Sequence, residues 1–518
     1  MRLSLVAVSA LADANLYRAV ARHLSPAGPR RARALTVLAF LCVSTGLVCN
    51  SCAFLPSTFA MYLTSFTFAS LAELPARQGA AGSPQNYMHA TRCIWFMVVG
   101  VLVGWPFVGL LALPIAGLLL FQVRLGLWPL VKSAVVAVLL VSLPMAVVES
   151  AVYGRMTLPP LNIVLYNVFA AAGDSTLYGT EPAWFYLANL VINFNAAAIL
   201  SLLLPLVLLM KRFLQPELAS SAAGLSDGYL LWWISPLYLW LAFFSAQAHK
   251  EERFMFVVYP LVAVAAGVAL ADAAALVGAL LAALCKWRRG GSAHTRCVRA
   301  LVYAGLGVAA AVNLARALTL VLGFSAPFRV WAHAGSVLPR YRRNWGLLQA
   351  PLTVCVGKEW YRFPGHLFVD PDGLGGDDGA NSRVVWKLGF VKSEFDGQMP
   401  SLFATAPQGV GVLEALRYRL LAAQHVDPSF NSLNDEVMSR YVDVSECNFL
   451  IDRSSSEQTE RRFDADTDTW EVLYTEPFLN AARSRFPWKT FYVPLMSHHL
   501  NHFDTYTLLR NRKSTRPK

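Results

Sequence analysis

Residues 230–284 read LLWWISPLYLWLAFFSAQAHKEERFMFVVYPLVAVAAGVALADAAALVGALLAAL. Two apolar runs, 230–246 and 254–284, flank the charged stretch HKEER at 249–253. Each run has the length that a helix needs to cross a bilayer, which is roughly 17–25 residues or longer when the helix is tilted. The pattern therefore predicts two membrane-spanning helices joined by a polar connection.

The whole chain has the composition of a polytopic α-helical membrane protein. Of its 518 residues, 56% are hydrophobic and 15% are charged, and the mean hydropathy is +0.44. A soluble protein of this length is excluded, because the apolar residues come in runs long enough to cross a bilayer. The formal net charge of +12 is then a signal of membrane topology, and it does not indicate a nucleic-acid partner.

Basic residues between the apolar runs predict how the chain crosses the membrane. The expected spans cover about 3–20, 35–53, 57–72, 131–152, 184–210, 230–246, 254–284 and 300–322, with a hairpin of two short helices within 93–121. Gly104-Trp105-Pro106 is expected to break that hairpin. The basic connections fall on the cytosolic face by the positive-inside rule, and 249–253 falls on the opposite face. We therefore expect a multi-span transmembrane domain over 1–324.

The sequence pattern changes after residue 324. Short β-like runs alternate with loops rich in glycine and aspartate, at 352–356, 384–388, 449–452 and 491–495. This pattern predicts a soluble α/β domain over 325–518, on the same side of the membrane as the charged stretch.

We expect no metal ion and no cofactor. The acidic stretch DPDG at 370–373 lacks the spacing and the terminal glutamate of a calcium loop. The stretch HHLNH at 498–502 has no carboxylate or cysteine at ligand spacing. Cys49 and Cys52 form a C-x-x-C pair without a second pair, which is better explained as thiols buried among helices.

His249, Lys250 and Arg253 are the candidate ligand-binding residues, because charges at a membrane boundary commonly mark a functional site. Two interpretations remain open. Lys250 and Arg253 can extend to lipid head groups, while Glu251 and Glu252 complement the dipole of the following helix. Alternatively, the helix N-terminus and the two cations form a cradle for a phosphate. In that case Glu251 or Glu252 orients the cations.

The charged stretch, followed by Tyr259-Pro260, resembles the signature of glycosyltransferase family 22. The stretches PLNIVLYNVF at 160–169 and LYGTEP at 177–182 are similar to loops of the same family. The resemblance continues in VCVGKEWYRFP at 354–364 and SEFDGQ at 393–398. It implies the GT-C architecture and the function of an endoplasmic reticulum mannosyltransferase that uses dolichyl phosphate mannose.

The reaction that the resemblance implies is an inverting transfer of mannose in N-glycan precursor assembly. Dolichyl phosphate mannose is the expected donor, and a dolichyl-pyrophosphate-linked oligosaccharide, extended by an α-1,2 linkage, is the expected acceptor. Both lipids and the membrane are the expected partners. His249, Lys250 and Arg253 are then expected to bind the donor phosphate on the lumenal side, with Glu251 and Glu252 as orienting carboxylates.

Four further residues are candidate contacts to the acceptor or to the sugar. Tyr178, Thr180 and Glu181 lie on an expected lumenal loop, where they can hydrogen-bond to sugar hydroxyls. Trp360 lies beside charged residues in the soluble domain, which suits stacking on a sugar ring. A packed loop in which Glu181 caps the next helix, and a core tryptophan, are the alternatives. No residue is assigned as the catalytic base.

Members of the family begin with a further span and a lumenal loop that carries an Asp-Glu pair. Met1 aligns beyond this segment, so we expect the sequence to be a fragment or the product of an incomplete gene model. The alternatives to the expected activity are a catalytically incomplete membrane protein that binds a lipid-linked sugar or a partner enzyme, and a glycolipid-anchor mannosyltransferase.

Overall fold

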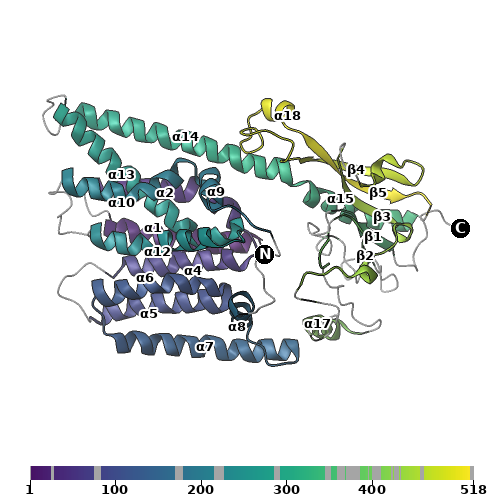
Figure 1. Ribbon diagram of the computed structural model, residues 1–518, viewed down its shortest axis with the longest axis horizontal. Helices are drawn as coiled ribbons and strands as arrows, with labels where there is room; N and C mark the ends of the chain where they lie inside the picture. The colour runs from purple at the N-terminus through teal and green to yellow at the C-terminus, as the bar shows by residue number, and fades with distance from the viewer. Residues whose placement is uncertain are drawn as a thin grey trace. The chain divides into compact units, whose positions relative to one another are not determined.

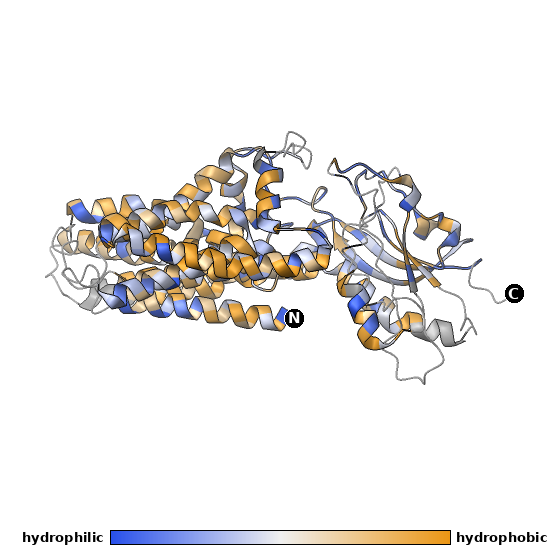
Figure 2. Cartoon of the chain, turned by 90° about the horizontal axis from the view of Figure 1, so that it is seen from below, coloured by the Kyte–Doolittle hydropathy of each residue, from blue (hydrophilic) through white to orange (hydrophobic). Residues whose placement is uncertain are grey.

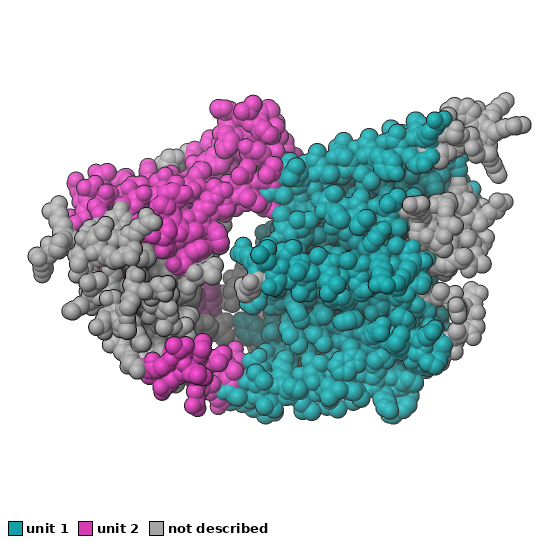
Figure 3. All heavy atoms as spheres, turned by 180° about the vertical axis from the view of Figure 1, so that it is seen from behind, with its two compact units in different colours: residues 1–151, 155–317 teal, residues 152–154, 318–518 magenta. Residues whose placement is uncertain are grey.

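The structure is a computed structural model with two compact units. It describes residues 2–24, 29–74, 83–169, 179–214, 227–284, 292–344, 352–358, 368, 386–394, 396–399, 410–421, 424, 431, 433–455 and 460–513. Unit 1 comprises residues 1–151 and 155–317, and unit 2 comprises residues 152–154 and 318–518 (Figure 3).

Unit 1 is helical (Figure 1). Its helices are α1 (Arg2–Leu24), α2 (Pro29–Val43), α3 (Thr45–Asn50), α4 (Pro56–Ala72), α5 (Pro84–Val99), α6 (Ala112–Gly117), α7 (Leu127–Tyr153), α8 (Pro159–Val164), α9 (Phe185–Phe194), α10 (Ala196–Leu214), α12 (Asp227–Ala246), α13 (Tyr259–Leu284) and α14 (Ser292–Phe324), the last of which continues into unit 2. Among the described residues, seven helices are long and apolar enough to cross a membrane. Hydrophobic residues dominate these helices in Figure 2. The predicted polytopic α-helical class is confirmed.

Proline marks the start of several helices. Pro56, Pro84 and Pro159 are the first residues of α4, α5 and α8. Proline suits the first turn because its φ is already helical and the N–H that it lacks would have no partner there. Ser83 caps α5 by accepting a hydrogen bond from the Asn86 N–H at 3.2 Å.

The predicted break at Gly104-Trp105-Pro106 is confirmed. The π-helix η1 (Gly100–Gly104) continues α5 and ends at Trp105, which is extended. The 3-10 helix η2 (Pro106–Leu111) follows and leads directly into α6. The other short helical segments of unit 1 are η3 (Leu118–Gln122), η4 (Leu165–Phe169) and η6 (Glu252–Val258).

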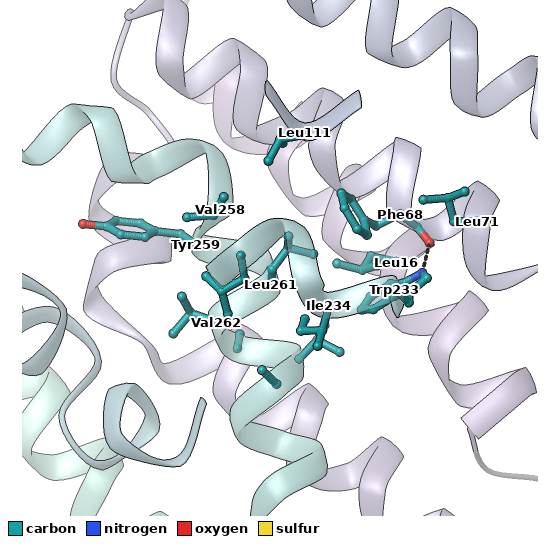
Figure 4. Close-up of a cluster of buried hydrophobic side chains, with 14 of the residues drawn as sticks. Leu16, Phe68, Leu71, Leu111, Trp233, Ile234, Val258, Tyr259, Leu261 and Val262 are labelled. Atoms are coloured by element: carbon teal, nitrogen blue, oxygen red, sulfur yellow. Dashed lines mark hydrogen bonds between the residues drawn. The ribbon is translucent and has the colours of Figure 1, made fainter. Parts of the chain in front are cut away.

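Helix α13 lies at the centre of unit 1 and packs against α2 and α10. Its residues 259–269 are buried along their whole length. Figure 4 shows part of the surrounding core, in which the indole Nε1 of Trp233 donates to the carbonyl oxygen of Phe68 at 3.2 Å. This hydrogen bond satisfies the polar atom of a tryptophan that is otherwise enclosed by apolar side chains.

A glycine allows α13 to approach α2. A Cβ atom on Gly267 would lie 2.5 Å from the backbone nitrogen of Val37. The Thr36 hydroxyl donates to the carbonyl oxygen of Gly267 at 2.6 Å. The close contact is therefore between two backbones, which cannot move aside as a flexible side chain can.

Replacing Gly267 by alanine is expected to reduce the free energy of unfolding by about 1–3 kcal/mol, because the added methyl overpacks the α2–α13 contact. The thermal unfolding midpoint of the detergent-purified protein measures this change. Gly278→Ala is the matched control on the same helix, since a Cβ there meets Val298 at an ordinary 3.9 Å. Equal midpoints for the two variants would contradict the expected overpacking.

Four charged side chains from four helices form an ion cluster inside unit 1. Arg33 of α2 donates through Nε to Asp272 Oδ1 of α13 at 2.7 Å. Lys211 Nζ of α10 lies 3.1 Å from Asp227 Oδ1 of α12 and 3.5 Å from Asp272 Oδ2. Arg33, Lys211 and Asp272 are buried. The two cations and two carboxylates neutralise one another, which removes most of the cost of charges within a membrane protein.

Unit 2 contains a five-stranded sheet in the order β2-β1-β3-β5-β4. The strands are β1 (Leu352–Val356), β2 (Trp386–Phe390), β3 (Phe449–Ser454), β4 (Trp470–Leu479) and β5 (Phe503–Asn511). Strand β1 pairs in parallel with β2 and β3, and β5 pairs antiparallel with β3 and β4. The helices are α15 (Ala326–Asn344), α17 (Val412–Leu420) and α18 (Met496–Leu500), with the 3-10 helices η9 (Met438–Arg440), η10 (Val444–Glu446) and η11 (Phe463–Ala465). The predicted α/β class is confirmed.

The strand predictions within unit 2 were correct in part. The runs 352–356 and 449–452 lie in β1 and β3, and the run 384–388 overlaps β2. The predicted strand at 491–495 was wrong. Pro494 lacks an N–H for a ladder, and Leu495 has a φ of 66°, so the extended run ends there and α18 begins. The predicted domain boundary at 325 falls between α14 and α15.

A disulfide joins Cys355 of β1 to Cys447, which precedes β3. Both cysteines are buried. The cross-link ties two neighbouring strands together across a sequence separation of 92 residues. Sequence analysis missed this pairing because the scattered cysteines showed no framework spacing.

An ion pair lies beside the same strands. Lys358 Nζ donates to Asp452 Oδ2 at 2.5 Å, and the Lys358 N–H donates to Asp452 Oδ1 at 3.0 Å. Burial raises the pKa of the Asp452 carboxyl, and Lys358 opposes this effect. A Cβ on Gly357 would overlap the Asp452 carboxylate. The glycine in VCVGKEWYRFP is thus required by the packing of this ion pair.

Candidate active site

The charged stretch 249–253 connects α12 to α13. Helix α12 ends at Ala246, and Glu251 is extended with φ −130° and ψ 146°. The 3-10 helix η6 then begins at Glu252 and passes into α13. The side chains of 249–253 make separate sets of contacts.

Lys250 binds a neighbouring loop. Its side chain is buried, with a relative exposure of 6% for the residue. Its Nζ donates to the carbonyl oxygen of Glu181 at 2.7 Å and also to that of Gln247. The Glu181 N–H donates to the carbonyl oxygen of Ala248 at 3.1 Å. The backbone of Glu181 is therefore held on both sides.

His249 strengthens this attachment. Its Nδ1 lies 2.9 Å from the carbonyl oxygen of Gly179, which places an N–H at Nδ1. Its Nε2 lies 3.3 Å from Glu251 Oε1. The segment 179–181 is thus docked on 247–250, although about 70 residues separate the two in the sequence.

Arg253 has a more open environment. Its Nη2 donates to Glu251 Oε1 at 2.6 Å, and its side chain keeps a relative exposure of 46%. The guanidinium also lies 5.8 Å from the centroid of the Phe254 ring. Arg253 is therefore positioned by a carboxylate and an aromatic ring while part of its hydrogen-bonding edge remains accessible.

Glu252 turns toward the interior of unit 1. Its Oε1 accepts a hydrogen bond from Asn193 Nδ2 of α9 at 2.9 Å. The same Nδ2 donates to Asn189 Oδ1 at 3.1 Å, and the Tyr259 hydroxyl donates to that oxygen at 3.2 Å. Asn193 and Tyr259 are buried. This polar network fixes the start of η6.

Aromatic rings pack beneath the charged stretch. The ring of Trp105 lies 5.1 Å from that of Phe254 and 5.5 Å from that of Phe244, centroid to centroid. Trp240 Nε1 donates to the carbonyl oxygen of Phe254 at 3.0 Å. The rings give the cations a rigid apolar base, which favours a fixed geometry over free movement in solvent.

Unit 1 contains a cavity of about 470 Å³. Its wall includes Gly104 and Pro106, which flank Trp105 in the sequence. Leu102 and Val103 of η1 and the helices α7 and α8 contribute the rest of the wall, mainly with apolar side chains, and Glu149 is an ionisable residue on it. The cavity is suited to an apolar ligand that has a polar end.

The structure brings together part of the predicted site. The residues 249–253 and the backbone of 179–181 meet, as described above. Thr180 and Glu181 are exposed, and within the described parts of the chain neither the hydroxyl nor the carboxylate has a partner. Tyr178 and Trp360 lie outside the described residues.

Two residues near the site were missed by sequence analysis. Asn193 bridges Glu252 and Arg316, because its Oδ1 also accepts from Arg316 Nε at 3.4 Å. Arg316 lies within the apolar helix α14. A single arginine inside a predicted span was itself a signal of a functional residue, since such charges are costly in a membrane.

Replacing Lys250 by methionine is expected to release the loop from 179 to 181 and to lower the sugar transfer that the resemblance implies by about tenfold or more, because a displaced site residue loses catalytic alignment. Transfer assays and hydrogen exchange at the Glu181 amide measure both effects. Gln247→Ala is the matched control, since Lys250 binds the Gln247 carbonyl oxygen and that oxygen is kept. Unchanged exchange in the methionine variant would contradict the clamp.

Comparisons with known proteins identify the family. The model of the Alg9-like mannosyltransferase family matches residues 1–370. The chain is 34% identical to alpha-1,2-mannosyltransferase ALG9 of Mus musculus over 522 residues, which cover 99% of this chain and 76% of the relative. It is equally 34% identical to alpha-1,2-mannosyltransferase ALG9 of Homo sapiens, again with 99% and 76% covered.

Among solved structures, the chain is similar to ArnT from Cupriavidus metallidurans bound to undecaprenyl phosphate. The identity is 14% and the TM-score is 0.44, with 87% of this chain and 78% of ArnT covered. The sequence comparisons with the family model and with the relatives are the stronger result. The chain belongs to the Alg9-like mannosyltransferase family and is a membrane-embedded glycosyltransferase.

Proposed function

We propose that the chain transfers mannose from dolichyl phosphate mannose to a dolichyl-pyrophosphate-linked oligosaccharide, forming an α-1,2 linkage with inversion. The relatives named alpha-1,2-mannosyltransferase support the linkage. The observation that carries the proposal is the position of Arg253, a half-exposed guanidinium held by Glu251 beside the docked segment 179–181. The reaction belongs to N-glycan precursor assembly in the endoplasmic reticulum.

Arg253 is the proposed direct contact to the donor phosphate, and His249, whose two ring nitrogens contact Gly179 and Glu251, positions the segment beside it. Cleavage of the bond between mannose C1 and the phosphate oxygen leaves the electron pair on that oxygen. A guanidinium can neutralise the departing phosphate through two parallel hydrogen bonds. Lys250 keeps one N–H beyond the two that its carbonyl contacts use, and its charge adds to the local positive potential.

The carboxylates have different proposed roles. Glu251 orients Arg253, to which it is directly hydrogen-bonded. Glu252 orients the backbone of η6 through Asn193. Thr180 and Glu181 contact hydroxyls of the sugar or the acceptor, because their side chains are exposed on a segment whose backbone is fixed.

The acceptor hydroxyl attacks C1 of mannose as the bond to phosphate breaks, and its proton passes to a base. The proposal assigns no residue as this base. Because phosphate is a good leaving group, positioning and charge neutralisation supply much of the rate increase. The cavity lined by Gly104 and Pro106 is the proposed slot for the isoprenoid chain, since its wall is mainly apolar and these two residues flank Trp105, whose ring packs on Phe254.

The disulfide supports a lumenal position for unit 2, because disulfides persist in oxidising compartments. Two spans, α13 and α14, separate the charged stretch from residues 325–518 in the sequence. An even number of crossings puts both on one side of a membrane. We therefore propose that 249–253 also faces the lumen.

A transfer assay tests this proposal. The full chain, purified from cells that lack their own Alg9-like enzyme, is mixed with dolichyl phosphate mannose and a defined dolichyl-pyrophosphate oligosaccharide. The expected product is extended by mannose that an α-1,2-mannosidase removes. Transfer only to a glycolipid-anchor acceptor, or binding of the lipids without turnover, would overturn the proposed function.

A further inference from the structure

Arg316 is a charged residue in a membrane helix with few partners. It lies in the span Arg296–Phe324 of α14 and is partly buried. Its Nε donates to Asn193 Oδ1 at 3.4 Å, a long hydrogen bond. Among the residues that the structure describes, none accepts a hydrogen bond from its Nη1 or Nη2. The Nη1 and Nη2 groups of Arg316 are therefore donors without an acceptor among the described residues.

The charges near Arg316 leave it only indirectly compensated. Glu252 acts on its guanidinium electrostatically. No ion pair within 4.0 Å joins Arg316 to a carboxylate in the described part of the chain, and Asn193 lies between Arg316 and Glu252. A guanidinium inside a membrane protein is costly unless it pairs closely with an anion. The guanidinium is therefore a cation that an anionic ligand can pair with.

The side-chain amide of Asn195, two residues after Asn193, is a second donor without an acceptor among the described residues. Asn195 occupies the break between α9 and α10 with a φ of 52°. Its Nδ2 is buried and has no acceptor among the described residues. The break thus supplies two asparagines: Asn193 holds Arg316, and Asn195 has a free N–H group. Broken membrane helices commonly supply polar groups to a ligand in this way.

We propose that Arg316 binds the phosphate of an isoprenoid-linked substrate. The proposal rests on the proposed function, and it adds to Arg253 a second cation that sequence analysis did not identify. Arg316 is connected to the charged stretch through Asn193 and Glu252, so both cations belong to one polar network. The phosphate oxygens take the two Nη groups in the planar geometry that arginine favours.

Two substrates carry suitable phosphates, and their kinetics distinguish them. Arg316→Met is expected to raise the KM of dolichyl phosphate mannose or that of the diphosphate-linked acceptor by about tenfold or more, because charge-assisted hydrogen bonds are lost. The KM that rises identifies the phosphate bound. Arg316→Lys keeps the charge without the planar edge and is expected to give an intermediate KM.

Arg299→Met is the matched control, since Arg299 is exposed on the same helix and far from the network in sequence. Arg316→Gln replaces Arg316→Met if the latter does not fold, with the same expected result. Affinity for dolichyl phosphate, measured directly on the folded proteins, gives a readout independent of turnover. If the wild-type chain transfers no mannose, the proposed function fails while this binding measurement still tests Arg316.

Both KM values remaining within about twofold of wild type in the neutral variant would overturn the proposal. Loss of kcat with both KM values unchanged would overturn it as well, because Arg316 would then act only by positioning Glu252. A raised KM in Arg299→Met equal to that in Arg316→Met would show a general charge effect and would also contradict specific binding.

Discussion

Replacing Arg253 by alanine is expected to lower mannose transfer by about a hundredfold or more, the usual effect of removing one group that stabilises a developing anion. Membrane insertion and thermal stability should remain near wild type, since the Arg253 side chain is half exposed and contributes one ion pair, to Glu251. The rate of transfer from dolichyl phosphate mannose, measured on the purified protein, gives the result directly.

Two further variants define what Arg253 contributes. Arg253→Lys keeps the charge and is expected to retain part of the activity, because a lysine cannot make the two parallel hydrogen bonds of a guanidinium. Arg155→Ala is the control, since Arg155 is an exposed arginine in the connection that follows α7. Transfer by Arg253→Ala equal to that by Arg155→Ala would refute the phosphate-binding role.

The second large effect is expected in the ion cluster of α2, α10, α12 and α13. Replacing Asp272 by asparagine leaves Arg33 and Lys211 with Asp227 as the remaining carboxylate. Because an uncompensated buried charge is costly, the free energy of unfolding should fall by about 3–5 kcal/mol. The yield of folded protein in detergent and its unfolding midpoint measure the loss.

A charge-balanced double variant separates electrostatics from packing. Combining Asp272→Asn with Lys211→Met removes one charge of each sign and leaves Arg33 beside Asp227, at 3.6 Å. This variant should recover a large part of the lost stability. If it is no more stable than Asp272→Asn alone, the cluster stabilises the helices by packing and not by charge balance.

The sequence predicted the helical membrane class well, because each span is a local property of composition. The break at Trp105 was also predictable, since proline cannot continue a helix. The partners within the ion cluster were not, because Arg33 and Asp272 are 239 residues apart and meet only once the helices have packed. No periodicity identifies which buried charges will face one another.

In the candidate site, too, the grouping of sequence neighbours could be predicted and the contacts between distant residues could not. His249 to Arg253 are adjacent in the chain, so their association required no tertiary information. The hydrogen bond from Lys250 to the Glu181 carbonyl oxygen could not be predicted. The position of a lysine in the sequence does not reveal whether its ammonium group binds a phosphate or a carbonyl oxygen. In unit 2, the polar and charged residues of β4 and β5 hid both strands from a search for apolar runs.

The affinity of the folded chain for dolichyl phosphate tests the central claim most directly, because it isolates recognition of the phosphate from turnover. We expect dolichyl phosphate to bind the wild-type protein and to bind Arg253→Ala about tenfold or more weakly, in line with the loss of a charge-assisted hydrogen bond. Equal affinity for the two proteins would contradict the assignment of the charged stretch 249–253 as the phosphate site.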